Sequence, residues 1–264
     1  MRFRDGYNGS SFMELLETQY PHLSPRWDRL FAATGELPAQ AHGTTVIGLR
    51  FADGAMVAGD RLATMDYRVA SRDIEKVFAT DDYSLMAIAG AAGPAIEMAR
   101  LLGIQFEHHE KIEGEPLELE GKANTLAHLI TQNLPAAMPG LVVVPIFAGF
   151  DRRRRVGRLW RYEVTGGRYE EKEYDSVGSG AIFARESLKK SFRPEASREE
   201  ALGMVLEALA DAADEDRGTG GVDALRRIYP TVKTCTSQGI EEISDTQVAE
   251  VHQSILDGRR RPTE

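Results

Sequence analysis

This chain is organised around the stretch Gly43-Thr44-Thr45-Val46-Ile47-Gly48-Leu49-Arg50-Phe51, residues 43–51. β-branched and apolar residues dominate it from residue 44 onward, which is typical of a β-strand. The sequence before it is interrupted by Pro21, Pro25 and Pro38 and ends in the small-residue run 39–43, which is typical of a linker. We therefore predict a leader over residues 1–43 and a folded domain over residues 44–264.

Downstream of this strand, the sequence alternates between blocks of strands and blocks of helices. Strand-like segments occupy 54–59, the region around 67–71, 76–79 and 83–89, and helical patterns follow from Pro94 to about Lys111 and over about 122–134. The second half predicts strands near 142–150, 158–164, up to Val177, 225–233 and 240–243, with helices at about 181–192, 198–215 and 245–257. Such separate blocks predict an α+β fold of two packed antiparallel sheets flanked by helix pairs.

Composition limits the possible functions. The chain has 264 residues, of which 42% are hydrophobic, so it can bury a sizeable core. Its net charge of −9 argues against nucleic acid as a partner. Because no run reaches the roughly 18 apolar residues of a membrane span and residues 1–30 lack a signal-peptide core, we expect no membrane association. The single cysteine, Cys235, suggests a buried thiol in a reducing cytoplasm.

Four local features favour ordinary structural roles over special ones. The basic run 152–155 lies between two strand-like segments and predicts a hairpin turn or a subunit contact. His108, His109 and Glu110 lack a suitably spaced third ligand, so we expect a helix surface and no metal site. The glycine-rich segment 218–221 lacks the lysine of a phosphate-binding loop. His42 is interpreted as a linker residue, although it could assist cleavage next to it.

Thr44 can act as a nucleophile if it becomes the first residue of a mature chain. A threonine hydroxyl needs a base, and the free α-amine of the same residue, with a pKa near 8, can supply one. Gly43 has no side chain to hinder attack on its carbonyl. Asp60 ends the second strand and Lys76 opens a later one, and a buried Lys–Asp pair can hold positive charge beside a hydroxyl. These residues predict cleavage between Gly43 and Thr44.

Several motifs in order resemble the catalytic half of proteasome β subunits. They are Thr-Thr-Val-Ile-Gly-Leu from residue 44, Gly-Asp-Arg-Leu-Ala-Thr from 59, Lys-Val-Phe from 76 and Ala-Ile-Ala-Gly-Ala-Ala-Gly from 87. Ser-Val-Gly-Ser-Gly-Ala from 176 and Asp-Arg-Gly-Thr-Gly-Gly from 216 continue the resemblance, which covers about residues 44–245. The resemblance implies the four-layer αββα sandwich of N-terminal nucleophile hydrolases.

The resemblance also implies site residues. The expected catalytic set is Thr44, Asp60, Lys76, Gly90, Ser179, Asp216 and Thr219, with Gly90 as the oxyanion donor. Relatives often have serine where Thr219 stands, and either hydroxyl can form the hydrogen bond. The expected specificity pocket comprises Ala63, Ile74, Phe78, Ile88 and Ala92, which favours cleavage after hydrophobic residues. Neither a metal nor an organic cofactor is expected.

The implied activity is a threonine endopeptidase that degrades unfolded proteins. The implied partners are copies of the chain in a seven-membered β ring, α subunits in a four-ring barrel, a ring ATPase activator and tagged unfolded substrates. A simpler two-ring bacterial protease is the nearest enzymatic competitor, but its subunits begin almost directly at the threonine. An inert ring subunit and an N-terminal nucleophile amidase acting on a small molecule remain as alternatives.

Overall fold

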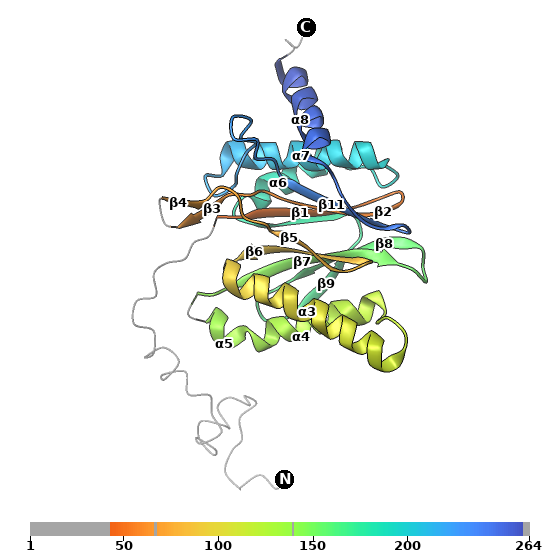
Figure 1. Cartoon of the computed structure of the whole chain (residues 1–264). Helices are drawn as coiled ribbons and strands as arrows, with labels where there is room; N and C mark the ends of the chain where they lie inside the picture. The colour runs from red at the N-terminus through yellow and green to blue at the C-terminus, as the bar shows by residue number, and fades with distance from the viewer. Residues whose placement is uncertain (1–42, 66–67, 139, 261–264) are drawn as a thin grey trace, which may run out of the picture. The chain divides into compact units, whose positions relative to one another are not determined.

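A computed structural model of the chain describes residues 43–65, 68–138 and 140–260 (Figure 1). The predicted leader up to His42 and the last residues of the chain lie outside the described residues. No helix within the described ranges combines the length and the apolar character needed to cross a bilayer.

The described part of the domain forms four layers, with two sheets between two layers of helices (Figure 1). The first sheet has the order β10-β1-β2-β11-β12 and contains β1 (Thr45–Phe51), β2 (Gly54–Gly59), β10 (Tyr174–Gly178), β11 (Thr231–Thr236) and β12 (Gly239–Glu242). The second has the order β5-β6-β7-β8-β9 and contains β5 (Val77–Asp81), β6 (Ser84–Gly90), β7 (Val143–Asp151), β8 (Val156–Tyr162) and β9 (Arg168–Glu171). The predicted α+β sandwich of antiparallel sheets is confirmed.

Helix pairs cover the outer faces of both sheets. α6 (Ala181–Ser191) and α7 (Arg198–Glu215) lie over the first sheet, with α8 (Asp245–Arg260) against α7 (Figure 1). α3 (Ala92–Glu113) and α4 (Leu119–Gln132) cover the second sheet, and the short α5 (Leu134–Ala137) follows α4. β3 (Ala63–Met65) and β4 (Arg68–Ser71) pair with each other and form a separate two-stranded sheet.

Three hydrophobic clusters fill the spaces between the layers. In β1, Val46 faces the space between the sheets, whereas Ile47 and Leu49 face the cluster under α6 and α7. Burial on both faces explains why β1 and β2 are almost continuously apolar. The third cluster, which includes Phe147 and Trp160, lies between the second sheet and α3 and α4. Thr44, immediately before β1, therefore adjoins a strand that is packed into the core.

Some predicted elements differ from the observed ones. The strand predicted over 225–233 begins only at Thr231, because Arg227 has a left-handed φ of 56° and Pro230 has no N–H to donate. β9 was not predicted, since its charged sequence Arg-Tyr-Glu-Glu gives no apolar alternation at the edge of the sheet. α3 begins at Ala92, before Pro94, because the first turn of a helix does not need the N–H that proline lacks.

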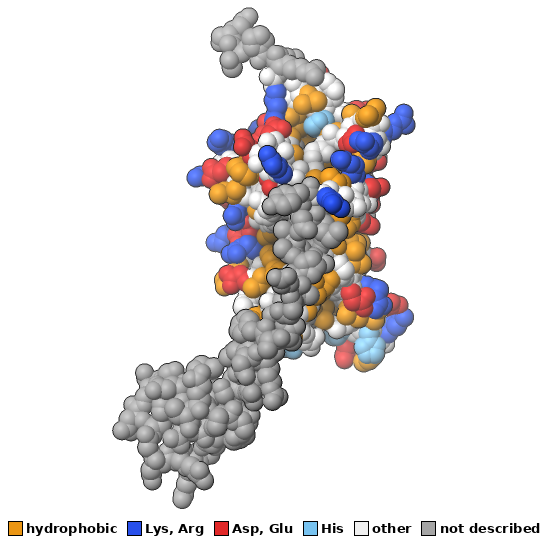
Figure 2. Space-filling model, turned by 90° about the vertical axis from the view of Figure 1, so that its left-hand side faces the viewer, with side chains coloured by type: hydrophobic (Ala, Val, Ile, Leu, Met, Phe, Trp, Pro, Cys, Tyr) orange, Lys and Arg blue, Asp and Glu red, His pale blue; other side chains and the backbone are white. Residues whose placement is uncertain are grey.

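Two local predictions agree with the structure. Residues 152–155 form the turn between β7 and β8, and Cys235 is a buried free thiol whose pKa burial raises to about 12. Figure 2 shows acidic and basic side chains interspersed on one face of the molecule, without a continuous basic patch. The absence of such a patch on this face agrees with the negative net charge of the sequence.

Candidate active site

Thr44 lies immediately before β1, and its side chain is buried. Its hydroxyl donates a hydrogen bond to the carbonyl oxygen of Gly43 at 2.7 Å. Its own carbonyl oxygen accepts a hydrogen bond from the Ser179 N–H at 2.9 Å. The nucleophile candidate is thus held against the peptide bond whose cleavage the sequence predicts, and its backbone is fixed by the segment that follows β10.

Asp60 is the centre of a hydrogen-bond cluster at the end of β2. Its Oδ1 accepts from the Thr45 N–H at 2.8 Å and from Lys76 Nζ at 2.6 Å. Its Oδ2 accepts from the N–H groups of Leu62 at 3.0 Å and Gly220 at 2.8 Å. The pairing of β1 with β2 places this carboxylate beside the start of β1. Asp60 therefore connects Thr45, the residue after Thr44, to Lys76.

Lys76 precedes β5 and is almost fully buried. Its ammonium donates to Asp60 Oδ1 at 2.6 Å and to the Leu62 carbonyl oxygen at 2.6 Å, which accounts for two of its three N–H groups. Burial lowers the pKa of Lys76, while the negative charge and the hydrogen bond of Asp60 act in the opposite direction, and the net result is a lowered pKa. The site therefore contains a buried cation whose third N–H can donate to a further acceptor.

A second chain of hydrogen bonds joins the start of β1 to the loop after α7. The Gly180 N–H donates to Thr45 Oγ1 at 3.0 Å, and Thr45 Oγ1 lies 2.6 Å from Thr219 Oγ1. Thr219 donates to Asp216 Oδ2 at 2.6 Å, and Ser179 donates to the same oxygen at 2.5 Å. Because Thr219 uses its only hydroxyl proton for Asp216, Thr45 must be the donor in the threonine pair.

Asp216 remains ionised at neutral pH in this arrangement. Its burial alone would raise its pKa, but hydrogen bonds from Ser179, Thr219 and the Gly218 N–H outweigh that effect and lower the pKa. A carboxylate that accepts several hydrogen bonds orients each donor. Asp216 therefore holds Ser179 and Thr219, the two hydroxyl residues predicted for the site, in place.

Gly43 packs directly on the loop that contains Gly218. A Cβ atom added to Gly43 would lie 2.2 Å from Gly218 Cα, so no side chain fits at this position. The Gly43 N–H donates to Thr64 Oγ1 at 3.0 Å. Gly43, the last residue of the predicted leader, is thus held by its hydrogen bond to Thr64 of β3 and by its close contact with Gly218 in the loop after α7.

Gly90 ends β6 with φ of 107°, a conformation that glycine adopts readily. A Cβ atom there would lie 2.1 Å from the Val142 carbonyl oxygen. Gly90 and Gly178 line the same hollow, and Gly178 contacts the Thr44 carbonyl oxygen closely enough that a Cβ atom would lie 1.8 Å from it. The proposed oxyanion glycine therefore borders a hollow that is also lined by Gly178, which contacts the backbone of Thr44.

The residues predicted for specificity occupy different environments. Ala63 is buried in β3, Ile74 is half-buried before β5, and Ala92 begins α3. Ile88 is buried in the cluster beneath α3, and Phe78 packs against the same cluster. Both side chains thus contribute to core packing, and the role of all five in a specificity pocket stays a prediction.

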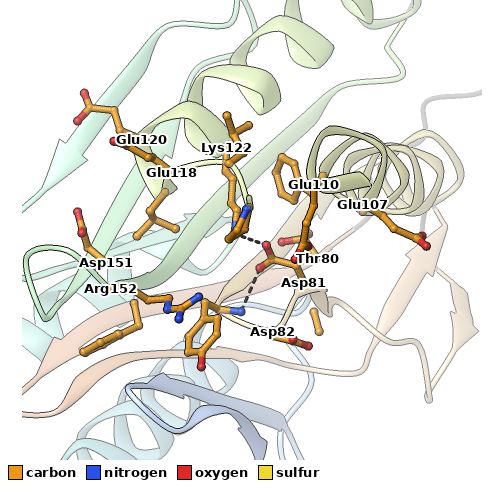
Figure 3. A pocket seen from close by; sticks show the side chains of 18 of the residues that line it. Thr80, Asp81, Asp82, Glu107, Glu110, Glu118, Glu120, Lys122, Asp151 and Arg152 are labelled. Carbon is orange, nitrogen blue, oxygen red and sulfur yellow. Dashed lines mark hydrogen bonds and ion pairs between the residues drawn. The ribbon is translucent and has the colours of Figure 1, made fainter. Parts of the chain in front are cut away.

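A second, larger hollow lies elsewhere in the domain. Its volume is about 1010 Å³, and α3, α4 and the turns β5–β6 and β7–β8 surround it (Figure 3). Lys122 is paired with Asp81 inside it, and the Arg152 guanidinium lies 4.8 Å from the centre of the Tyr83 ring. None of the seven candidate catalytic residues lines this hollow, so size alone does not identify the site.

The family model "Proteasome subunit" matches residues 40–225, a range that contains every predicted site residue. The chain belongs to the proteasome subunit family. It is also 48% identical over 250 residues to a protein of Streptomyces griseus subsp. griseus named "Proteasome subunit beta", and the match covers 95% of this chain and 89% of that protein. Membership of the proteasome subunit family makes this chain a component of a larger protease assembly.

The structure brings six of the seven predicted catalytic residues into one hydrogen-bonded region and places Gly90 at its border. Sequence reasoning missed Thr45 and Thr64, which contact the network through their hydroxyl groups. Thr45 is hidden within an apparent strand, and its spacing from Thr219 gives no local signal. His108 is exposed on α3 and His109 is half-buried there, far along the chain from this network.

Proposed function

We propose that this chain is the catalytic β subunit of a proteasome core, an N-terminal threonine endopeptidase. In this proposal residues 1–43 are a prosegment, residues 44–264 form the mature subunit, and cleavage occurs between Gly43 and Thr44. The observation that carries the proposal is the 2.7 Å contact between the Thr44 hydroxyl and the Gly43 carbonyl oxygen, beside the buried Asp60–Lys76 pair. Family membership and the 48% identical relative named a β subunit support it.

Processing would begin when Thr44 Oγ attacks the carbonyl carbon of Gly43. The C–N bond between the two residues then breaks, the Thr44 nitrogen takes up the hydroxyl proton as an amine, and an ester joins Gly43 to Thr44 Oγ. Water hydrolyses this ester, which releases the leader with a free carboxylate and leaves Thr44 with a free amine and hydroxyl. Lys76 contributes positive charge near the reacting atoms, where developing negative charge needs stabilisation.

Peptide hydrolysis would follow the same chemistry with an external substrate. The free amine of Thr44, with a pKa near 8, takes the hydroxyl proton as Thr44 Oγ attacks the substrate carbonyl. The Gly90 N–H stabilises the oxyanion, the leaving peptide takes the proton, and water then hydrolyses the acyl ester. Asp60, Ser179, Asp216 and Thr219 position these groups through the hydrogen bonds described above. This route uses side chains and backbone of the protein and water.

Further elements of the proposal concern the assembly. The chain would form seven-membered β rings stacked inside a four-ring barrel with proteasome α subunits, in the cytoplasm. A ring ATPase would deliver tagged unfolded proteins. Cleavage after hydrophobic residues is expected from Ala63, Ile74, Phe78, Ile88 and Ala92. Confinement within a barrel would keep an unselective nucleophile away from folded proteins.

Intact mass and N-terminal sequencing of particles co-expressed with an α partner test the proposal. We expect a β chain that begins at Thr44 and hydrolyses peptides. Thr44→Ala should keep residues 1–43 and lose peptidase activity, whereas Thr44→Ser should retain part of both reactions because its hydroxyl remains. A different mature N-terminus would exclude this chemistry, and a small active particle would favour the amidase alternative.

A further inference from the structure

A smaller hollow opens next to the candidate nucleophile, at the edge of the sandwich formed by β10. Its volume is about 420 Å³. We call it the β10-edge hollow, and the lining residues used below are Gly90, Arg161, Gly178, Ala181 and Arg185. Gly90 is the proposed oxyanion donor, and Gly178 packs on the Thr44 carbonyl oxygen. An occupant of this hollow would therefore contact Gly90 and Gly178, the residue that packs on the backbone of Thr44.

Among the residues that the structure describes, Arg161 and Arg185 are the only charged ones that line the β10-edge hollow. Arg185 Nη1 lies 3.3 Å from Asp175 Oδ1, and Arg161 Nε lies 3.1 Å from Asp175 Oδ2. Asp175 is buried behind them and does not line the hollow, and Arg161 also pairs with Glu171 at 3.5 Å. Each guanidinium has five N–H donors, so these contacts leave donors for a further acceptor.

The adjoining helix adds to the positive potential. α6 begins at Ala181, its cap residue Gly180 provides no side-chain acceptor, and its first turn contains no acidic residue. The N-terminal end of a helix favours negative charge because its first N–H groups lack partners within the helix. Two arginines and this helix end thus present donors to one space. The chemistry suits a carboxylate, which a guanidinium can bind through two oxygens.

We propose that the β10-edge hollow binds an acidic side chain of the substrate on the C-terminal side of the cut bond. This inference rests on the proposed peptidase function and adds a selective subsite to it. None of the five residues predicted for the hydrophobic pocket lines the hollow, although both regions adjoin Gly90. The two regions thus have separate lining residues, and the proposal assigns Arg161 and Arg185 to the leaving portion of the substrate.

The test uses assembled particles containing the full mature chain and internally quenched peptides. The peptides share one sequence and carry Glu, Gln or Lys at each of the first three positions after the cut bond in turn. We expect kcat/KM for Glu to exceed that for Gln about fivefold at one of these positions, as a partly exposed ion pair allows, with Lys lowest. Raising the salt concentration should reduce this ratio.

Substitutions of Arg161 and Arg185 test whether these two side chains cause the preference for Glu. Arg185→Gln and Arg161→Gln should each lower the Glu-to-Gln ratio toward one, and Arg185→Glu should favour Lys. Lys189→Gln removes one positive charge from the same helix at an exposed position outside the hollow, and it should leave the ratio unchanged. Each Glu-to-Gln ratio compares two peptides cleaved by the same variant, so a change in that variant's overall rate does not alter the ratio.

The outcomes separate this inference from the proposed function. Wild-type particles that cleave a peptidyl aminocoumarin, which has no residues after the cut bond, but treat Glu and Gln peptides alike would overturn the inference alone. Retention of the preference in both Arg185→Gln and Arg161→Gln would do the same. Failure to cleave any peptide would contradict the proposed function and the inference with it.

Discussion

Asp60 accepts four hydrogen bonds, two on each carboxylate oxygen, from Thr45, Lys76, Leu62 and Gly220. Four is the approximate accepting capacity of a carboxylate. Every donor in the set therefore has a fixed direction, including the buried ammonium of Lys76. The position of this one cation depends on residues from four separate segments of the chain.

Lys76→Ala should abolish processing and peptide hydrolysis, with a loss on the order of 100-fold or more in rate. Lys76→Arg should fail as well, because a planar guanidinium does not replace a compact ammonium between Asp60 and the Leu62 carbonyl oxygen. Processing is measured by intact mass and hydrolysis by peptide turnover in assembled particles.

Lys122→Ala is the matched control, since Lys122 is also buried and paired with one carboxylate, but lies in the large hollow away from Thr44. Both alanine variants should lower the free energy of unfolding, which denaturant titration measures. Only Lys76→Ala should lose activity in folded particles. Near-normal turnover in either Lys76 variant would remove this lysine from the mechanism.

Thr219→Val should break the hydrogen-bond connection between the loop after α7 and Thr45 at the start of β1. It removes the donor to Asp216 and the acceptor for Thr45, and an unsatisfied buried polar group costs about 1–3 kcal/mol in free energy of unfolding. We expect slower processing and hydrolysis together with lower thermal stability. Thr219→Ser keeps the hydroxyl and should retain most of the activity and most of the thermal stability. If Thr219→Val and Thr219→Ser had equal rates and equal stability, the hydroxyl would have no role.

The lowered pKa of Lys76 predicts opposite responses of activity and stability to alkaline pH. Burial makes the folded chain release this proton below the ordinary lysine value of 10.5. Between the folded and unfolded pKa values the unfolded chain binds more protons, so the contribution of Lys76 to the free energy of unfolding rises with pH. The rate of processing, which needs the cation, should fall over the same interval. A processing rate that stays constant up to pH 10.5 would contradict this.

At the scale of elements, the end of the leader and the loop after α7 fit together through two glycines. Gly43→Ala would place a Cβ atom 2.2 Å from Gly218 Cα, so the scissile carbonyl must move. Displacement by about 1 Å can cost on the order of 100-fold in rate, and we expect processing to slow by about that factor. Time-resolved intact mass after assembly measures it.

Gly203→Ala supplies a control within α7. A Cβ atom there meets no heavy atom within 4 Å, so the substitution should stabilise the helix by about 1 kcal/mol and leave processing unchanged. If Gly43→Ala is processed at the wild-type rate, the close contact with Gly218 does not restrict the cut bond.

At the scale of the whole molecule, the chain should be poorly active alone and become active when co-expressed with a proteasome α chain. The loop containing Asp216 and Thr219 connects α7 to the first sheet and exposes Arg217 and Gly221, through which contacts between subunits can stabilise its active arrangement. The leader residues Phe12, Leu15, Leu16, Leu30 and Phe31, which lie outside the described residues, provide apolar side chains that suit an assembly role.

The measurement compares particle mass, processing and peptide hydrolysis with and without the α partner. Thr44→Ala particles serve as the control for processing in trans, because any cleavage of their leader must come from another subunit or protease. A fully processed monomer with high peptidase activity would contradict the assembly proposal, although the chemistry of Thr44 would survive.

The sequence by itself determined the order of most elements, and it predicted the chemical identity of the site. Apolar periodicity is local, so β1, β2, β6, α7 and most other elements could be predicted from their own residues. Charged β9 and the turn containing Arg227 could not, because an edge position and a left-handed residue leave no such pattern. Thr44, Asp60 and Lys76 lie within short motifs and were predicted together.

Only the tertiary structure decided which groups complete the network. Thr45 meets Thr219, 174 residues away, and Gly43 meets Gly218, because the first sheet and the loop after α7 converge at the start of β1. The β10-edge hollow likewise combines residues of both sheets and α6. Contacts between distant segments depend on how the layers stack, and the spacing of residues along a strand or helix does not encode that arrangement locally.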